Sequence, residues 1–169
     1  TEILNDFLSL GKLEEGQIRN VPIVFPVTDF CKELVDELKS VCKENQQIIY
    51  THEGDSEVCV DRHLLKNVLI NLLSNASKYS DAGKQIFLRS SKKEKTVRFE
   101  VQDQGIGIPE QDQAYVFDRF FRAHNSGTIQ GTGLGLNIVK KYIQLMQGEI
   151  QLTSQLNQGT TVSLDLPNC

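Results

Sequence analysis

No stretch of this chain approaches the roughly 18 consecutive apolar residues that a bilayer-spanning helix requires. No signal peptide is visible, and lysine and arginine do not reach the excess that a nucleic-acid-binding face needs, since the formal net charge is -4. We therefore expect a cytoplasmic domain that contacts neither a membrane nor a nucleic acid. Because the chain begins with Thr1 rather than methionine, we also expect it to be a fragment of a longer protein. Whether that parent protein has a membrane anchor is left open.

Cysteine is scarce, and its spacing matches no metal-binding pattern. Cys31, Cys42, Cys59 and Cys169 lie far apart, without a C-x-x-C pair. A chain of 169 residues buries about 70% of its unfolded surface, so its core needs neither a disulfide nor a metal. We expect four reduced thiols, as in most cytosolic proteins, rather than a disulfide or a zinc site.

Two common nucleotide-binding signatures are also missing. The chain has no G-x-x-x-x-G-K-[ST] loop, and its glycine-rich stretch Gly131–Gly135 follows no predicted strand, as the dinucleotide fingerprint would require. Regular β-α-β alternation, which predicts a doubly wound parallel sheet, is absent as well. A nucleotide site in this chain would have to be built in another way.

Hydrophobic periodicity predicts one domain of mixed helices and strands. We expect helices at 1–15, from 28 or 29 to 41, at 62–79 and from 135 to about 148, and strands at 22–27, 46–52, 57–60, 85–90, 96–103, 149–154 and 160–166. Pro22 and Pro26 confine the first strand to a sheet edge, Thr28 or Asp29 is expected to cap the second helix, and Asp61 the third. This order predicts a two-layer α/β sandwich, with a mixed sheet and about three helices on one face.

One stripe of the predicted helix 62–79 is unusually rich in asparagine. Asn67, Asn71, Asn75 and Lys78 follow at helical spacing, on a side turned away from the leucines. Asparagine is a mediocre helix former, and a solvated face would more commonly carry Glu and Lys. Neutral amide oxygens can hold Mg²⁺ while a triphosphate supplies the negative charge. The stripe alone leaves both a solvated face and a magnesium site open.

The predicted strand 96–103 ends in a carboxylate on its core side. Asp103 continues the alternation of Val97, Phe99 and Val101, so its burial requires a hydrogen-bond donor. An adenine amino group is a suitable donor, and the glycines that follow allow a flat base to approach. A capped turn is the alternative, although the apolar residues between and after those glycines favour a pocket wall.

Two further segments are candidates for binding phosphate. The loop Gly131–Gly135 opens directly onto a helix, whose free N–H groups suit a polyphosphate. Phe117–Arg122 places aromatic residues beside two arginines, just before sequence without periodicity at 124–135. This segment is either a local hydrophobic cluster or the hinge of a lid, with Arg119 or Arg122 turning toward phosphate.

Together, these segments resemble the N, G1, F and G2 boxes of the catalytic ATP-binding domain of sensor histidine kinases. That family belongs to the superfamily of gyrase B, Hsp90 and MutL. The matching segments are Asn71–Tyr79, Asp103–Pro109, Phe117–Arg122 and Gly131–Leu136, within a resemblance that spans about residues 20–167. It implies a Bergerat-type ATP-binding fold at 18–169, preceded at 1–17 by the end of the second helix of a dimerisation and histidine-phosphotransfer domain.

The resemblance also implies residue roles, with ATP and Mg²⁺ as ligands. Asn75 would bind the metal, Asn71, Lys78 and Arg122 would be catalytic, and residues 118–132 would form an ATP lid. Tyr79 would lie along the adenine and Asp103 would accept from its amino group. The other residues implied to bind the nucleotide are Gly105, Gly107, Ile108, Phe117, Arg119, Gly131, Thr132, Gly133, Leu134, Gly135, Leu136 and Thr160.

One position distinguishes kinases from hydrolases in this superfamily. The ATPases carry a glutamate four residues before the metal-binding asparagine, as the general base for water. Here that position is Asn71, whose amide cannot accept a proton. A neutral imidazole is already nucleophilic near pH 7, so Asn71 favours transfer of the γ-phosphoryl group to a histidine. The alternatives are an ATPase of the same superfamily and a non-catalytic nucleotide-binding module.

The phosphoacceptor histidine itself is not found in this chain. His52, His63 and His124 are its only histidines, and none lies in a helix with the expected S-H-E-x-R-x-P-L pattern. We expect all three to be ordinary polar residues, with His124 alone near the γ-phosphate. The implied partners are ATP, a histidine-phosphotransfer domain of the parent chain or its dimer mate, and a downstream response regulator receiver domain.

Overall fold

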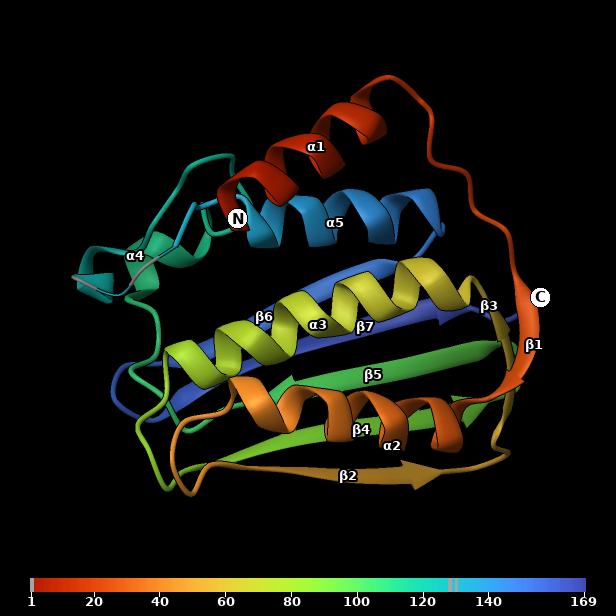
Figure 1. The fold of residues 1–169 in the computed structure, drawn as a ribbon, viewed down its shortest axis with the longest axis horizontal. Helices are drawn as coiled ribbons and strands as arrows, with labels where there is room; N and C mark the ends of the chain where they lie inside the picture. The colour runs from red at the N-terminus through yellow and green to blue at the C-terminus, as the bar shows by residue number, and fades with distance from the viewer. Residues whose placement is uncertain (1, 128, 130) are drawn as a thin grey trace.

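The computed structural model describes residues 2–127, 129 and 131–169, and it has a mixed five-stranded sheet covered by helices (Figure 1). The sheet order is β2–β4–β5–β7–β6, formed by Gln47–Glu53, Gln85–Lys93, Thr96–Gln102, Gly159–Pro167 and Glu149–Gln155. β2 pairs with β4 in parallel, and the other neighbours are antiparallel. The predicted two-layer sandwich is confirmed. Residue 1 of the predicted first helix and residues 128 and 130 of the predicted lid lie outside the described residues.

Three helices lie side by side across one face of the sheet, as predicted: α2 (Val27–Leu38), α3 (Arg62–Lys78) and α5 (Gly135–Leu145) (Figure 1). α3 is the central one, and its Leu65, Leu69 and Leu72 are buried. The Asp61 side chain caps α3, accepting the Leu64 N–H at 2.9 Å as predicted. Burial of the leucine face fixes α3 on the sheet, so its asparagine stripe has a defined position.

The first helix, α1 (Glu2–Glu14), packs on the outside of α5 rather than on the sheet (Figure 1). Its Leu10 is buried in the common core, whereas Leu4, Phe7 and Leu8 are about half exposed. None of the helices in the described part of the chain is long and apolar enough to cross a membrane.

The predicted start of α2 is wrong by one or two residues. α2 begins at Val27 with Pro26 as its N-cap residue, and neither Thr28 nor Asp29 caps it. The Val27 N–H instead donates to the Ser56 carbonyl at 2.8 Å, so a tertiary contact replaces the side-chain cap. Val41, the predicted last residue of this helix, is exposed in the 3-10 turn η1 (Lys39–Val41), because the α-helix ends at Leu38.

Two short elements within the chain's most irregular region were not predicted. They are α4 (Glu110–Gln113) and the 3-10 turn η2 (His124–Ser126). Both are too short to show hydrophobic periodicity, so no sequence pattern marks them. η2 lies inside the segment predicted to be the lid.

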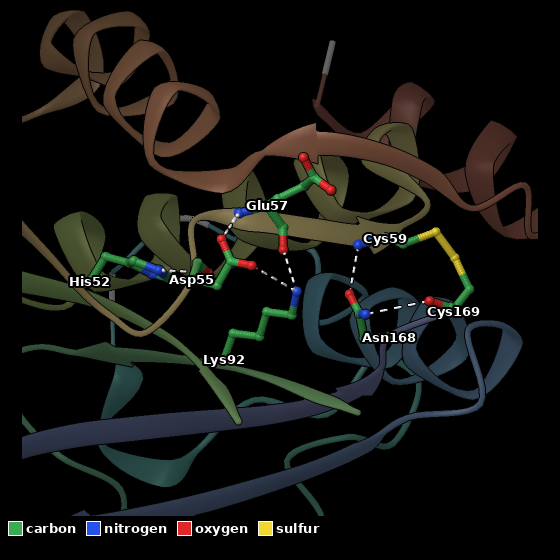
Figure 2. Close-up of polar contacts among 7 residues, drawn as sticks. All are labelled: His52, Asp55, Glu57, Cys59, Lys92, Asn168 and Cys169. Carbon is green, nitrogen blue, oxygen red and sulfur yellow. Dashed lines mark hydrogen bonds and ion pairs between the residues drawn. A yellow bond between two sulfur atoms is a disulfide. The ribbon is translucent and has the colours of Figure 1, made fainter. Parts of the chain in front are cut away.

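A separate two-stranded sheet closes one end of the molecule. β1 (Ile23–Pro26) pairs antiparallel with β3 (Glu57–Val60), and the prolines leave β1 at an edge as predicted. At the same end, Lys92 Nζ donates to the Glu57 carbonyl at 2.6 Å and lies 3.6 Å from the Asp55 carboxylate (Figure 2). These contacts join the β2–β3 turn to the end of β4.

The expectation of four reduced thiols is wrong for two of them. Cys59 of β3 and Cys169 form a disulfide across 110 residues of sequence (Figure 2). Two hydrogen bonds lay the end of the chain against β3: the Cys59 N–H donates to Asn168 Oδ1 at 2.6 Å, and the Cys169 N–H to the Cys59 carbonyl at 3.0 Å. Residue spacing could not reveal this pair, because only strand order brings the two cysteines together. Cys31 and Cys42 remain free.

Candidate functional site

A cavity of about 600 Å³ lies at the other end of the sheet, away from the disulfide. Its size is typical of small-ligand sites. It is enclosed by the C-terminal half of α3, the end of β5, the middle of β6, the start of β7 and the N-terminus of α5. The predicted site residues that line it are Asn71, Asn75, Lys78, Tyr79, Asp103, Gly107, Ile108, Arg122, Gly131, Thr132, Gly133, Gly135, Leu136 and Thr160.

The α3 wall of the cavity presents the side-chain amides of two asparagines to the start of α5. Asn71 Nδ2 donates to the Asn67 carbonyl at 3.0 Å, which leaves Asn71 Oδ1 as the acceptor on the cavity side. A Cβ built on Gly135 would lie 3.7 Å from Asn71 Oδ1 and 3.8 Å from Asn75 Nδ2. The space between the two elements is therefore narrow and lined by two neutral side-chain amides, whose oxygens are ligands of the kind that a hard divalent cation takes beside a phosphate.

The N-terminus of α5 opens onto this same space. Gly135 is its first residue, no side chain caps it, and its first turn carries no acidic residue. Thr132 Oγ1 accepts the N–H of Leu134 at 3.1 Å and so shapes the approach to the helix. The partial positive charge of a helix N-terminus suits an anion such as a phosphate group, and we call this the phosphate end of the cavity.

Asp103 lies at the opposite, apolar end of the cavity. Its Oδ1 accepts the N–H groups of Gly105 at 2.9 Å and Thr160 at 3.1 Å. Burial raises the pKa of Asp103, and those two N–H groups partly oppose the rise. Both of these hydrogen bonds are to Oδ1, and no described residue donates to Oδ2. The surrounding apolar residues are Val101, Ile106, Val116, Leu152 and Val162. A carboxylate in such a setting suits a flat base that carries an amino group, and we call this the base end.

Some of the predicted glycines serve backbone packing. A Cβ on Gly105 would lie 2.2 Å from the Tyr79 carbonyl, and one on Gly107 would lie 2.1 Å from the Gln155 carbonyl. At Gly133, where φ is +74°, a Cβ would lie 2.6 Å from the backbone of Phe120. Glycine is therefore required at these positions to bring segments together, whatever its role toward a base. Gly131 and Gly135 differ, since an added Cβ there meets only side-chain atoms beyond 3.5 Å.

Four predicted site residues do not line the cavity: Gly105, Phe117, Arg119 and Leu134. Leu134 is fully buried under α5, and Phe117 packs with the Lys140 ammonium 5.6 Å from its ring. Arg119 forms an ion pair with Glu14 of α1 and lowers the pKa of that carboxyl through a hydrogen bond and charge. Arg122 does line the cavity, where its guanidinium donates to the Ile129 carbonyl.

Sequence reasoning missed the contribution of α1, because α1 was assigned to another domain. Asn5 and Asp6 line the cavity, and Thr132 Oγ1 donates to Asp6 Oδ2 at 2.7 Å. The Phe7 ring lies 6.0 Å from that of Phe120 in the F box. Residues separated by more than a hundred positions meet here, and no local pattern predicts such a contact.

A second unpredicted pair joins α4 to η2, which lies within the segment predicted to be the lid. Asp112, whose side chain is 3% exposed, accepts the His124 N–H at 2.8 Å and lies 2.7 Å from His124 Nδ1. The His124 backbone N–H and then its ring lower the pKa of Asp112. Asn125 Nδ2 donates to the Gly107 carbonyl at 2.9 Å. These contacts hold η2 against α4 and against the Asp103–Pro109 segment.

The histidines do not line the cavity. His52 Nδ1 lies 2.7 Å from Ser90 Oγ, and its Nε2 lies 3.1 Å from the Asp55 carbonyl (Figure 2 shows the second contact). Neither His52, His63 nor His124 is among the described residues that line the cavity.

Comparison with known proteins identifies relatives of this chain. Residues 60–168 match the family described as histidine kinase-, DNA gyrase B- and HSP90-like ATPase. The chain is 33% identical, over 98% of its length, to the circadian input-output histidine kinase CikA of Synechococcus elongatus. It is 31% identical, over 96% of its length, to the signal transduction histidine-protein kinase ArlS of Staphylococcus aureus. It spans only 23% of the first relative and 37% of the second.

Solved structures show the same fold. The mycobacterial sensor histidine kinase MprB is 26% identical with a TM-score of 0.73, over 88% of this chain and 97% of that one. The full-length ShkA structure in complex with AMPPNP has a TM-score of 0.84, over 98% of this chain and 35% of that one. Its 23% identity supports the fold alone.

Proposed function

Since this chain belongs to the histidine kinase-, DNA gyrase B- and HSP90-like ATPase family and is a catalytic domain of the histidine kinase type, we propose that it binds Mg²⁺–ATP in the cavity and delivers the γ-phosphoryl group to a histidine on a separate domain. The observation that carries this proposal is the meeting of the asparagine stripe of α3 with the uncapped N-terminus of α5. One supplies neutral oxygen ligands for a cation, and the other supplies N–H groups for phosphate.

The base end would hold the adenine. Asp103 Oδ1 is already occupied by the N–H groups of Gly105 and Thr160, so Oδ2 would accept from the adenine amino group. Tyr79 and Ile108 line the cavity and would contact the ring. Gly105 and Gly107 would act mainly by allowing the backbone segments around the base to pack closely.

The phosphate end would hold Mg²⁺ and the triphosphate. Asn75 is the proposed metal ligand, with Asn71 Oδ1 beside it, and the bound ion would neutralise part of the phosphate charge. Gly131, Gly133 and Gly135 would wrap the phosphates, and Lys78 and Arg122 would supply further positive charge. Catalysis would then consist mainly of positioning and charge neutralisation.

Phosphoryl transfer is favoured over hydrolysis by the residue at position 71. A hydrolase needs a general base beside the phosphates, and the Asn71 amide cannot accept a proton. Its Nδ2 is also bound to the Asn67 carbonyl, which fixes the amide in one orientation. The nucleophile would therefore be a histidine that needs no base.

The wider assignments extend this proposal. Residues 1–17 would be the end of a dimerisation and histidine-phosphotransfer helix, and 18–169 the ATP-binding domain with its lid at 118–132. The partners would be that phosphotransfer domain and, downstream, a response regulator. The domain would work in the cytoplasm without touching a membrane.

Phosphotransfer in trans tests the proposal. The chain is incubated with γ-labelled ATP, Mg²⁺ and the histidine-bearing domain of its parent protein, and the acceptor is assayed for acid-labile, base-stable label. We expect label on the acceptor and little steady-state hydrolysis. Hydrolysis that is lost in Asn71→Ala would instead support an ATPase. ATP binding with neither reaction would support a non-catalytic module.

A further inference from the structure

Helix α1 places a negative charge at the phosphate end of the cavity. Asp6 lines the cavity and bonds to Thr132 of the loop before α5. The charged side chains that line the cavity in the described part of the chain are Asp6, Lys78, Asp103 and Arg122. Asp103 lies at the base end, so Asp6 is the carboxylate that a bound triphosphate would face.

The same contact occupies a hydrogen-bond donor. A threonine hydroxyl has one hydrogen to donate, and Thr132 donates it to Asp6 Oδ2 at 2.7 Å. The hydroxyl oxygen meanwhile accepts the Leu134 N–H at 3.1 Å. Phosphate oxygens only accept hydrogen bonds at neutral pH, so they would have to compete with Asp6 for this donor.

Several contacts hold α1 in this position. The Phe7 and Phe120 rings meet at 6.0 Å, and Glu14 pairs with Arg119 and, at 3.6 Å, with Lys141. Both Phe120 and Arg119 belong to the F box, at the start of the lid. The position of α1 is thus joined to the position of the lid, over and above the Asp6 contact.

We propose that α1 in this docked position opposes binding of nucleotide triphosphate, through the charge of Asp6 and through its capture of the Thr132 hydroxyl. The inference rests on the proposed binding of ATP phosphates at the start of α5. Because coupling between two binding events is reciprocal, bound ATP weakens the docking of α1 by the same factor. ATP binding and the position of the helix that leads into this domain are therefore antagonistic.

Two substitutions separate the charge from the hydrogen bond. Asp6→Asn removes the charge but keeps an acceptor for Thr132, whereas Asp6→Ala removes both. Dissociation constants for ATP, ADP and adenosine are measured by calorimetry in the presence of Mg²⁺. We expect ATP to bind about three- to tenfold more tightly to Asp6→Asn, and more tightly again to Asp6→Ala. The gain should be smaller for ADP and absent for adenosine.

Two further variants serve as controls. Glu15→Gln removes an equal charge from an exposed position outside the cavity, and it should leave all three affinities unchanged. Phe7→Ala loosens α1 while keeping Asp6, and because Phe7 is 50% exposed, the core stays intact. It should also tighten ATP binding, and the gains of Phe7→Ala and Asp6→Ala should not add.

The outcomes distinguish this inference from the proposed function. Unchanged or weaker ATP binding in Asp6→Asn and Asp6→Ala would overturn the antagonism while leaving the nucleotide site in place. An equal gain for adenosine would also overturn it, because adenosine has no phosphate to meet the charge. If the unmodified chain bound no ATP at all, the proposed function would fail and this inference with it.

Discussion

The two ends of the sheet are closed by different kinds of contact. At the disulfide end, the Cys59–Cys169 bond, the β1–β3 pairing and the Lys92 contacts join neighbouring segments directly. At the cavity end, the walls meet through backbone packing at glycines and through polar contacts of α1 and η2. In Figure 1 the β1–β3 sheet lies at one end of α3, and α4 lies at the other.

This difference shows how stability and ligand binding are divided along α3. Its first turn is capped by Asp61 and lies at the disulfide end, whereas its last turns carry Asn71, Asn75 and Lys78 to the cavity. Asp61 also accepts the Val21 N–H at 2.7 Å, which holds the chain entering β1. Substitutions at the disulfide end should therefore change the stability of the fold, and substitutions at the cavity end should change ligand binding.

Removal of the disulfide should give the largest effect and should spare the cavity. The bond closes a loop of 110 residues, so Cys59→Ser should lower the free energy of unfolding by about 3–5 kcal/mol. Thermal unfolding measures the loss, and reductant should reproduce it in the unmodified chain. Cys42→Ser, which removes a free thiol, is the matched control. A drop in ATP affinity in folded Cys59→Ser would break the division between the two ends.

Asn75→Ala should weaken nucleotide binding and leave the stability of the fold nearly unchanged. The loss of a ligand to Mg²⁺–ATP should weaken Mg²⁺-dependent nucleotide binding by about 2–3 kcal/mol, or roughly a hundredfold, with the unfolding temperature nearly unchanged. Asn67→Ala is the control, since Asn67 shares the stripe but does not line the cavity. Full Mg²⁺-dependent binding by Asn75→Ala would contradict the metal assignment.

The pH dependence of binding tests the base end. Because burial raises the pKa of Asp103, its carboxylate is lost at a higher pH than that of an exposed aspartate, and ATP affinity should fall as pH drops through that raised pKa. Because the pKa of Asp103 is raised in the folded state, the protonated carboxyl stabilises the fold at low pH. This stabilisation is lost as pH rises through the folded-state pKa. Asp103→Asn should bind ATP about tenfold more weakly at neutral pH, without this pH dependence. If ATP affinity depended on pH in the same way in the unmodified chain and in Asp103→Asn, Asp103 would not take part in recognising the base.

The Glu14–Arg119 pair should contribute least. Arg119 lowers the pKa of Glu14, so the pair stabilises the fold above the unfolded-state pKa of the carboxyl, and this stabilisation is lost as pH falls through the folded-state value. Both side chains are more than 40% exposed, so Glu14→Gln should shift the unfolding temperature by about 1 °C or less at neutral pH. A large shift would mean that α1 is fixed mainly by this pair rather than by the burial of Leu10.

Local patterns predicted most of the elements and much of the cavity. The 3.6-residue period marked α3 and its buried leucines, and the same period placed Asn71 and Asn75 together on another side of that helix. The two-residue period along β5 placed Asp103 on the core side. These predictions were correct because each depends on one regular element. The pattern of apolar and polar residues that decides which side of that element is buried lies within a short stretch of sequence.

What the sequence determined by itself was therefore the order and type of the elements, and the chemistry that α3, β5 and the start of α5 each carry. Tertiary structure alone decided which distant residues meet, such as Cys59 with Cys169 and Asp6 with Thr132. It also decided that Gly105 and Gly133 serve contacts between backbone segments. The physical reason is that helix and strand periodicities act over a few residues, whereas strand order and helix docking bring together residues more than a hundred positions apart.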